Sequence, residues 1–260
     1  MFRSDTFAAL RRERAQLIRF CSDLDAAQWR TPSKAAGWRV QDVIAHIGSA
    51  CHSMFTPASL RILRSTNIER TNDNFVDDRR SWTPAQTLAE YERWSRVLIT
   101  VAEAISRTPL AGLKMPLADL GRFPVGLVFG AAMTFDHHTH LRYDIAPALG
   151  LPTPDTDADR MRLVLEWMFA VLSNQLRATR PAWLKDPVGI TLHGPGGGSW
   201  VIDTNGAVRG RADATAAHIV GVAAEFPEWG TKRVDWRSRD VTVNENLDYG
   251  ARFLDAVNVV

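Results

Sequence analysis

Three side chains within the first 150 residues have the types and spacing of a metal site. Asp136 and His140 are four residues apart in FDHHTHLRYD, so on a helix they lie one turn from each other on nearly the same face. His46, in VQDVIAHIGSAC, falls at the edge of an apolar stripe and is expected to point toward the interior of a helix bundle. A His and an Asp-x-x-x-His pair on two facing helices could hold Zn²⁺ or another divalent ion with coordination positions left open.

Each of these residues also has a purely structural interpretation. An Asp and a His at this spacing form a simple hydrogen bond in many helices. A single His beside Val43 and Ile47 is usually a core residue with its polar atoms satisfied. The two interpretations stay open at the level of sequence, and the geometry of the three side chains decides between them.

The elements that must position these side chains are helices. Apolar periodicity predicts a first helix that ends near residue 24, a second that begins near Val40, and a fourth over about residues 124–148. The third has the clearest start, because Thr83 is a good N-cap and Gln86 can close a capping box. Four helices of about 20 residues predict a bundle.

Two long segments connect these helices. Residues 65–82 are polar, and residues 107–123 contain Pro and Gly. Loops of this length in a compact bundle are often functional lids or rim segments. Simple solvated linkers are the alternative interpretation.

Beyond Pro181 the period of the apolar pattern falls to two, which is typical of strands. Val188 to Leu192 and Trp200 to Ile202 alternate, and Asn205-Gly206 is a strong hairpin turn. The remaining expected elements are a helix over 213–226, a strand with Val241 and Val243, and a last helix from Leu247 to Val257.

The change of period predicts an α+β protein of two domains. The first, residues 1–150, is expected to be the helical bundle that carries the metal ligands. The second, residues 151–260, is expected to be a small α+β domain whose linking helix covers about 155–178.

Composition excludes several function classes. The chain has 31 Lys and Arg residues and 29 Asp and Glu residues, so it lacks the excess of basic residues that nucleic-acid binding needs. The longest apolar stretch, Phe123 to Phe135, is shorter than the roughly 20 residues of a membrane span, and the first residues do not resemble a secretory signal. Two cysteines, Cys21 and Cys51, are too few for a disulfide framework. We therefore expect a cytoplasmic protein that binds neither nucleic acid nor membranes.

The segments around the candidate ligands carry a family resemblance. WRTPSKAAGWRVQDVIAHIGS is similar to the opening signature of the mycothiol-dependent maleylpyruvate isomerase family, a branch of the DinB-like metalloenzymes. The shared features are a Trp, a Pro-Ser turn, a Gly-Trp pair and an Asp-Val-x-x-His helix start. FDHHTHLRYDIAPALGLP is similar to the second metal segment of that family, and LHGPGGGSWVI resembles part of its C-terminal domain.

The resemblance implies a DinB-like four-helix bundle followed by a sterol-carrier-like domain, with His46, Asp136 and His140 as the three metal ligands. Two features depart from the family pattern. An Asp replaces the usual Glu or His at position 136, so a closer approach of the helices or another carboxylate geometry is needed. Three residues instead of two separate His140 from Asp144, which leaves the place of Asp144 open.

The neighbouring histidines have lesser expected roles. His137 is a reserve ligand, and His138 is expected at the surface or in packing, on the far side of the helix from His140. Asp42, one turn before His46, could orient that histidine or simply favour the helix start; the second interpretation is preferred.

The resemblance also implies cofactors and a reaction. A divalent metal, with Zn²⁺ as the first candidate, would stabilise the thiolate of mycothiol, which then attacks a small electrophile in an isomerisation or an S-transfer. The best match to the catalytic loop Arg of the family is Arg233 in GTKRVDWRSR, with Arg237 and Arg239 as neighbours. A solvated basic loop is the alternative interpretation of that segment.

Other functions remain compatible with the sequence. One is a non-catalytic small-molecule-binding protein with a degenerate metal site, and another is a DinB-like hydrolase that uses metal-bound water. The expected partners are a small electrophile and a low-molecular-weight thiol, and a homodimer is an open form of assembly. Both cysteines are predicted to be structural, because the reacting sulfur would come from the soluble thiol.

Overall fold

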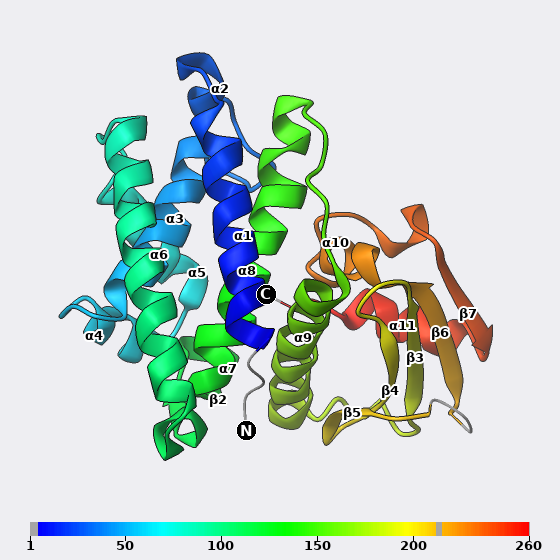
Figure 1. Cartoon of the computed structure of the whole chain (residues 1–260). Helices are drawn as coiled ribbons and strands as arrows, with labels where there is room; N and C mark the ends of the chain where they lie inside the picture. Colours follow the sequence, from blue (N-terminus) through cyan, green and yellow to red (C-terminus); the bar gives the residue numbers. More distant parts are fainter. Residues whose placement is uncertain (1–4, 212–214, 260) are drawn as a thin grey trace. The chain divides into compact units, whose positions relative to one another are not determined.

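The computed structural model describes residues 5–211 and 215–259, which divide into two compact units, Met1–Asp155 and Thr156–Val260 (Figure 1). The boundary expected from the sequence, after residue 150, lies near this division. None of the described helices combines the length and the apolar character that a membrane crossing requires.

The first unit is helical. Its helices are α1 (Asp5–Ser22), α2 (Ala26–Arg30), α3 (Val40–Ser53), α4 (Ser59–Leu63), α5 (Ile68–Asp77), α6 (Pro84–Ser106), α7 (Val125–Leu127) and α8 (Met133–Thr139). Helix α3 packs against α6 and α5, and α1 packs against α6 and α8. The core between them contains Leu17, Val43, Ile44, Tyr91 and Leu141, all completely buried.

The predicted starts of the second and third helices are confirmed. Helix α3 begins at Val40, and α6 begins at Pro84 with Thr83 as N-cap and Gln86 completing the capping box. The predicted fourth helix is a continuous helical run, but it is not uniform, because π-helical segments at Val128–Ala132 and His140–Ile145 flank α8. The run ends at Gly150, whose φ of 64° is the left-handed conformation that glycine adopts readily.

The two segments expected as irregular connections contain regular structure. Within 65–82, helix α5 begins after Asn67, whose side chain accepts a hydrogen bond from the Arg70 backbone N–H, and it buries Phe75 and Val76. Within 107–123, short 3₁₀ turns lead into a two-stranded antiparallel hairpin of β1 (Lys114–Pro116) and β2 (Arg122–Pro124). The loop interpretation is therefore wrong for residues 68–77. They form a capped amphipathic helix, although most of their side chains are polar.

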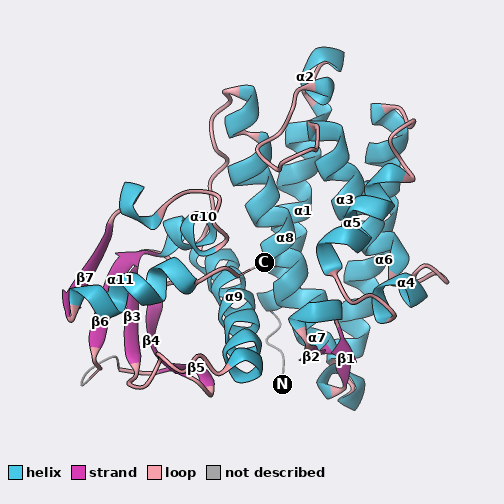
Figure 2. Cartoon of the chain, turned by 180° about the vertical axis from the view of Figure 1, so that it is seen from behind, coloured by secondary structure: helices cyan, strands magenta, loops and turns pink. Residues whose placement is uncertain are grey.

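The second unit combines helix α9 (Ala158–Thr179) with a five-stranded sheet (Figure 2). The strands are β3 (Val188–His193), β4 (Gly198–Asp203), β5 (Gly206–Arg209), β6 (Ala217–Val222) and β7 (Val241–Glu245), in the order β5-β4-β3-β6-β7. Only β3 and β6 pair in parallel among these strands. Short helix α10 (Phe226–Gly230) and helix α11 (Leu247–Ala256) complete the unit.

The expected helix over 213–226 is wrong where the structure describes the chain. Residues 212–214 lie outside the described residues, and Ala217–Val222 form β6, with a 3₁₀ turn and the start of α10 behind it. Ala217 and Ile219 are buried, whereas His218 and Val220 on the other face of the strand are half-exposed. This alternation of period two is the pattern of a strand, and it was missed because the apolar run is short.

Candidate metal centre

His46 is carried by α3, and the start of that helix is fixed by Asp42. The Asp42 carboxylate accepts hydrogen bonds from the Arg39 backbone N–H at 2.9 Å and from the Arg39 guanidinium at 2.9 and 2.8 Å. The Arg80 guanidinium is a further donor at 3.3 Å. Asp42 therefore anchors the first turn of α3, which confirms the preferred interpretation of this residue.

Asp136 and His140 come from the helical run that faces α3. Asp136 lies in α8, and His140 begins the π-helical segment His140–Ile145. Single π-helical turns inside α-helices occur frequently at functional sites. The irregular part of this helix therefore coincides with the candidate ligands.

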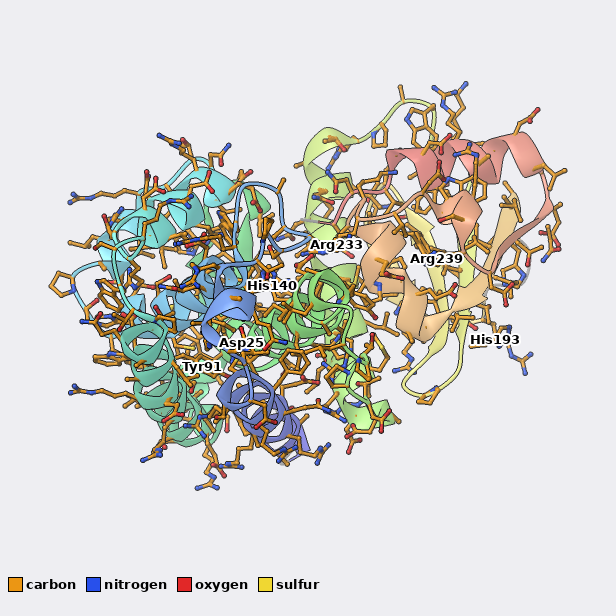
Figure 3. The ribbon with its side chains drawn as sticks, turned by 90° about the horizontal axis from the view of Figure 1, so that it is seen from above. Asp25, Tyr91, His140, His193, Arg233 and Arg239 are labelled. Carbon is orange, nitrogen blue, oxygen red and sulfur yellow. The ribbon has the colours of Figure 1, made fainter. Side chains whose placement is uncertain are left out.

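The structure brings the three predicted side chains together. The Nε2 atom of His46 lies 3.2 Å from Oδ1 of Asp136, and Nε2 of His140 lies 3.4 Å from the same oxygen. One donor atom from each side chain lies within 4.8 Å of the others. His140 lies among the helices of the first unit in Figure 3. We call His46, Asp136 and His140 the metal cluster.

The chemistry of the metal cluster fits a divalent cation. Two imidazole nitrogens and a carboxylate are a donor set that Zn²⁺ accepts. The second carboxylate oxygen of Asp136, Oδ2, is buried and has no hydrogen-bond partner. A buried carboxylate oxygen without a partner is costly, so this oxygen is a position at which a donor or a cation would stabilise the site.

The pKa values of the metal cluster point the same way. Burial raises the pKa of Asp136, but the charges and hydrogen bonds of His46 and His140 outweigh it and hold this pKa well below its usual range. Burial lowers the pKa of His140, but hydrogen bonds to Asp136 and Asp144 outweigh it and raise the pKa to about 9. The cluster therefore favours a positive charge beside the Asp136 carboxylate, which a metal ion can supply in place of a proton.

Asp144 lies directly behind His140. Its Oδ2 is 2.7 Å from Nδ1 of His140, and the Asp144 side chain is completely buried. A carboxylate that accepts a hydrogen bond from Nδ1 fixes the ring with Nε2 free for a metal. The altered spacing noted in the sequence thus leaves Asp144 in contact with the candidate ligand.

His137 and His138 lie outside the metal cluster. Nδ1 of His137 is 2.7 Å from the Met133 carbonyl oxygen, its ring packs on Tyr91, and burial lowers its pKa to about 4. His138 is completely buried, with its ring 6.0 Å from that of Tyr143. His138 is therefore a packing residue, and a surface position for it is wrong.

The two cysteines are buried. Burial raises the pKa of both thiols, and the nearby carboxylates of Asp136 and Glu90 raise that of Cys51 further. A buried thiol that stays protonated is a poor nucleophile. This agrees with the structural role predicted for both residues.

Arg233 belongs to the second unit (Figure 3). Its backbone N–H donates to the Glu228 carbonyl at 2.9 Å, and its guanidinium donates to Oγ1 of Thr231 at 2.8 Å. The neighbouring Arg237 forms an ion pair with Asp255, and Arg239 forms one with Glu228. These two arginines are thus engaged within their own unit, and the catalytic role of Arg233 stays a prediction.

Trp38 contacts the site, a role that the sequence does not predict. The Trp38 ring centroid lies 5.0 Å from that of His46 and 6.3 Å from that of His140. The signal was present in the Gly-Trp pair that precedes α3, but nothing in the spacing shows which way that ring points.

Comparisons with known proteins agree with this geometry. The sequence pattern of the mycothiol maleylpyruvate isomerase N-terminal domain matches residues 10–146, more than half of the chain. A crystal structure of a mycothiol-dependent maleylpyruvate isomerase is similar in fold, with 14% sequence identity, 92% of each chain covered and a TM-score of 0.58. The crystal structure of a His-to-Ala mutant of a mycothiol-dependent maleylpyruvate isomerase is also similar in fold, with 14% sequence identity, 92% of each chain covered and a TM-score of 0.56.

A search of curated proteins gives no match. The structural likeness supports the predicted fold class, a helical N-terminal part followed by a sheet-containing C-terminal part. On the strength of this match, whose range of residues 10–146 spans the metal cluster, the chain belongs to the mycothiol maleylpyruvate isomerase N-terminal domain family.

Proposed function

We propose that this protein is a divalent-metal-dependent enzyme that activates a low-molecular-weight thiol, mycothiol, for isomerisation of a small electrophile or for S-transfer to it. The observation that carries the proposal is the metal cluster, in which three donor atoms converge and Asp136 keeps a buried oxygen without a partner. Membership of the family supports mycothiol as the thiol.

The residues of the chain have distinct roles in this proposal. His46, Asp136 and His140 would hold the ion, and Asp144 keeps the His140 ring oriented through its 2.7 Å contact. A bound divalent ion, Zn²⁺ as the first candidate, would lower the pKa of a coordinating thiol so that the thiolate forms at neutral pH. Arg233 would bind a substrate carboxylate.

The reaction needs no nucleophile from the protein. In an isomerisation the thiolate adds to one carbon of a double bond, the bond that has become single rotates, and the thiolate leaves again, so the thiol is regenerated. In an S-transfer the new carbon–sulfur bond is kept, and either the other carbon of the double bond takes up a proton from solvent or the attacked carbon releases a leaving group with its bonding electron pair. The two buried, protonated cysteines support an external thiol as the source of sulfur, and their reduced state fits a cytoplasmic location.

The alternatives differ in what they consume. A hydrolase on the same fold would use water and turn over without thiol, and a binding protein would show no turnover. The metal cluster weighs against a degenerate site, because Asp136 reaches both histidines despite its short side chain.

The proposal is tested by following product formation with Zn²⁺-loaded protein, mycothiol and a panel of electrophiles that includes maleylpyruvate. We expect turnover that requires both Zn²⁺ and the thiol, with recovery of the thiol if the reaction is an isomerisation. Arg233→Ala should raise KM for carboxylate substrates, whereas Arg237→Ala, which removes an arginine already paired with Asp255, is the matched control. Turnover without thiol would show a hydrolase, and Zn²⁺ binding without any turnover would show a binding protein.

A further inference from the structure

Three aromatic rings meet at the metal cluster. The rings of His46 and His140 lie 5.1 Å apart, and the indole of Trp38 packs against both, at 5.0 and 6.3 Å between centroids. Trp38 is only 9% exposed. These distances are within the range of direct aromatic contact, so Trp38 shapes the space in which both imidazoles can turn.

The two histidines are held in different ways. His140 is fixed from behind by the Asp144 carboxylate at its Nδ1 atom. Within the described residues, the ring of His46 has one hydrogen bond, from Nε2 to Asp136, and no carboxylate or carbonyl behind it. The orientation of His46 therefore depends on the rings that pack against it, of which Trp38 is the nearest.

Trp38 is itself fixed by a residue outside the site. Its indole N–H donates to Oδ1 of Asp73 at 3.1 Å. Asp73 lies in α5, the helix within the segment expected as a connection, and α5 packs against α3. The indole N–H of Trp38 is thus hydrogen-bonded to α5, and the Trp38 ring packs against the two candidate ligands His46 and His140.

We propose that Asp73 and Trp38 act as positioning residues for the metal centre: Asp73 sets the orientation of the Trp38 indole, and the indole holds His46 with Nε2 toward the ion. This inference rests on the proposed function, because it assumes that His46 is a ligand. Through Trp38, Asp73 of α5 would orient the ring of His46, as Asp144 orients the ring of His140. Groups behind a metal ligand commonly change metal affinity by roughly 10- to 100-fold when they are removed.

Co²⁺ is a suitable probe, because its visible absorption reports coordination geometry independently of catalysis. Metal-free protein is titrated with Co²⁺ for the wild type, Trp38→Ala, Asp73→Ala and Asp73→Asn. We expect Trp38→Ala and Asp73→Ala to bind Co²⁺ more weakly, by roughly tenfold or more for Trp38→Ala, and to change the spectrum at saturation. Asp73→Asn should behave as the wild type, because the amide oxygen can still accept the indole N–H.

Asp77→Ala is the matched control for Asp73→Ala. Asp77 lies one turn further along α5 and forms an exposed ion pair with Arg80. Thermal unfolding of each metal-free variant separates loss of fold from loss of positioning. Asp73 is half-exposed, so Asp73→Ala keeps the test decisive even if Trp38→Ala does not fold.

Two results overturn the inference and can be told apart. A wild-type protein that binds no Co²⁺ refutes the proposed function, and the positioning roles with it. A wild-type protein that binds Co²⁺, with an unchanged affinity and spectrum in Asp73→Ala, refutes the positioning roles alone.

Discussion

Besides the metal cluster, the described part of the first unit contains a second cluster that joins histidine to carboxylate, and the two differ in how their charges are satisfied. In the second cluster, which we call the Arg79 cluster, Glu90 accepts hydrogen bonds from Arg79 through both carboxylate oxygens, at 2.5 and 2.7 Å. Nδ1 of His52 lies 2.6 Å from the same carboxylate, and the His52 ring stacks on Trp94. The negative charge of Glu90 therefore has its own cation within the protein.

Among the described residues, no Arg or Lys side chain is seen to pair with the carboxylate of the metal cluster. Its carboxylate is approached by two histidines, and one oxygen of Asp136 is left buried without a partner. The comparison shows that residue types alone do not distinguish a ligand site from a structural network. Hydrogen-bond accounting does, because the Arg79 cluster is complete as it stands and the metal cluster is not.

The largest expected effect is on metal content. His140→Ala and His46→Ala should each abolish stoichiometric Zn²⁺ binding, because two remaining ligands hold the ion far more weakly than three. Equilibrium dialysis with metal analysis measures the loss, and circular dichroism confirms that the variants are folded. His52→Ala is the matched control from the Arg79 cluster and should keep one equivalent of Zn²⁺. Equal loss from His52→Ala and His140→Ala would break the distinction between the two clusters.

At the Arg79 cluster we expect a substitution to lower the stability of the fold and to leave metal binding unchanged. Glu90→Gln leaves the guanidinium of Arg79 buried without its counter-charge; the side chains of Glu90 and Arg79 are 5% and 10% exposed. Removing one partner of a buried pair should lower the free energy of unfolding by about 3 kcal/mol, measured by denaturant titration. Zn²⁺ binding by the folded variant should be unchanged. A variant with wild-type stability would show that this network is not structural.

A smaller effect is expected behind the ligands. Asp144→Asn removes the charge that the Nδ1 atom of His140 faces at 2.7 Å. Zn²⁺ affinity should fall by roughly tenfold, as competition with a chelating indicator can measure. An unchanged affinity would mean that the Asp144 carboxylate serves the core and not the ion.

The smallest expected effect concerns the cysteines. Burial raises the pKa of Cys21 and Cys51, so both thiols stay protonated at pH 8, and neither should react with a thiol reagent until the protein unfolds. Cys51→Ala should retain Zn²⁺ binding and thiol-dependent turnover. Rapid modification of one thiol in the folded protein, with loss of turnover, would contradict an external source of sulfur.

Local signals explain how much of the site could be predicted from the sequence. The capping box of Thr83 and Gln86 identifies the start of α6, and apolar periodicity from Val40 onward identifies the start of α3. The four-residue spacing of Asp136 and His140 needs only a helix to bring both side chains to one face. These features depend on neighbours within a few residues, so a single sequence contains them.

The rest depends on contacts between distant segments. The contact of Trp38 with the metal cluster follows from how the chain enters α3 and from α5, and neither is visible in spacing. The polar α5 and the short strand β6 were misread, because the first is stabilised by a few buried side chains and the second by pairing with β3. The π-helical segments around α8 likewise reflect packing and have no sequence pattern of their own.

The most direct test of the account is diffraction from crystals grown with Zn²⁺ and measured at the zinc absorption edge. We expect an anomalous peak in the first unit at about 2.0 to 2.2 Å from Nε2 of His46, Nε2 of His140 and a carboxylate oxygen of Asp136. The absence of a peak among these three side chains, or a peak that only other residues surround, would contradict the central claim that the metal cluster is the metal centre.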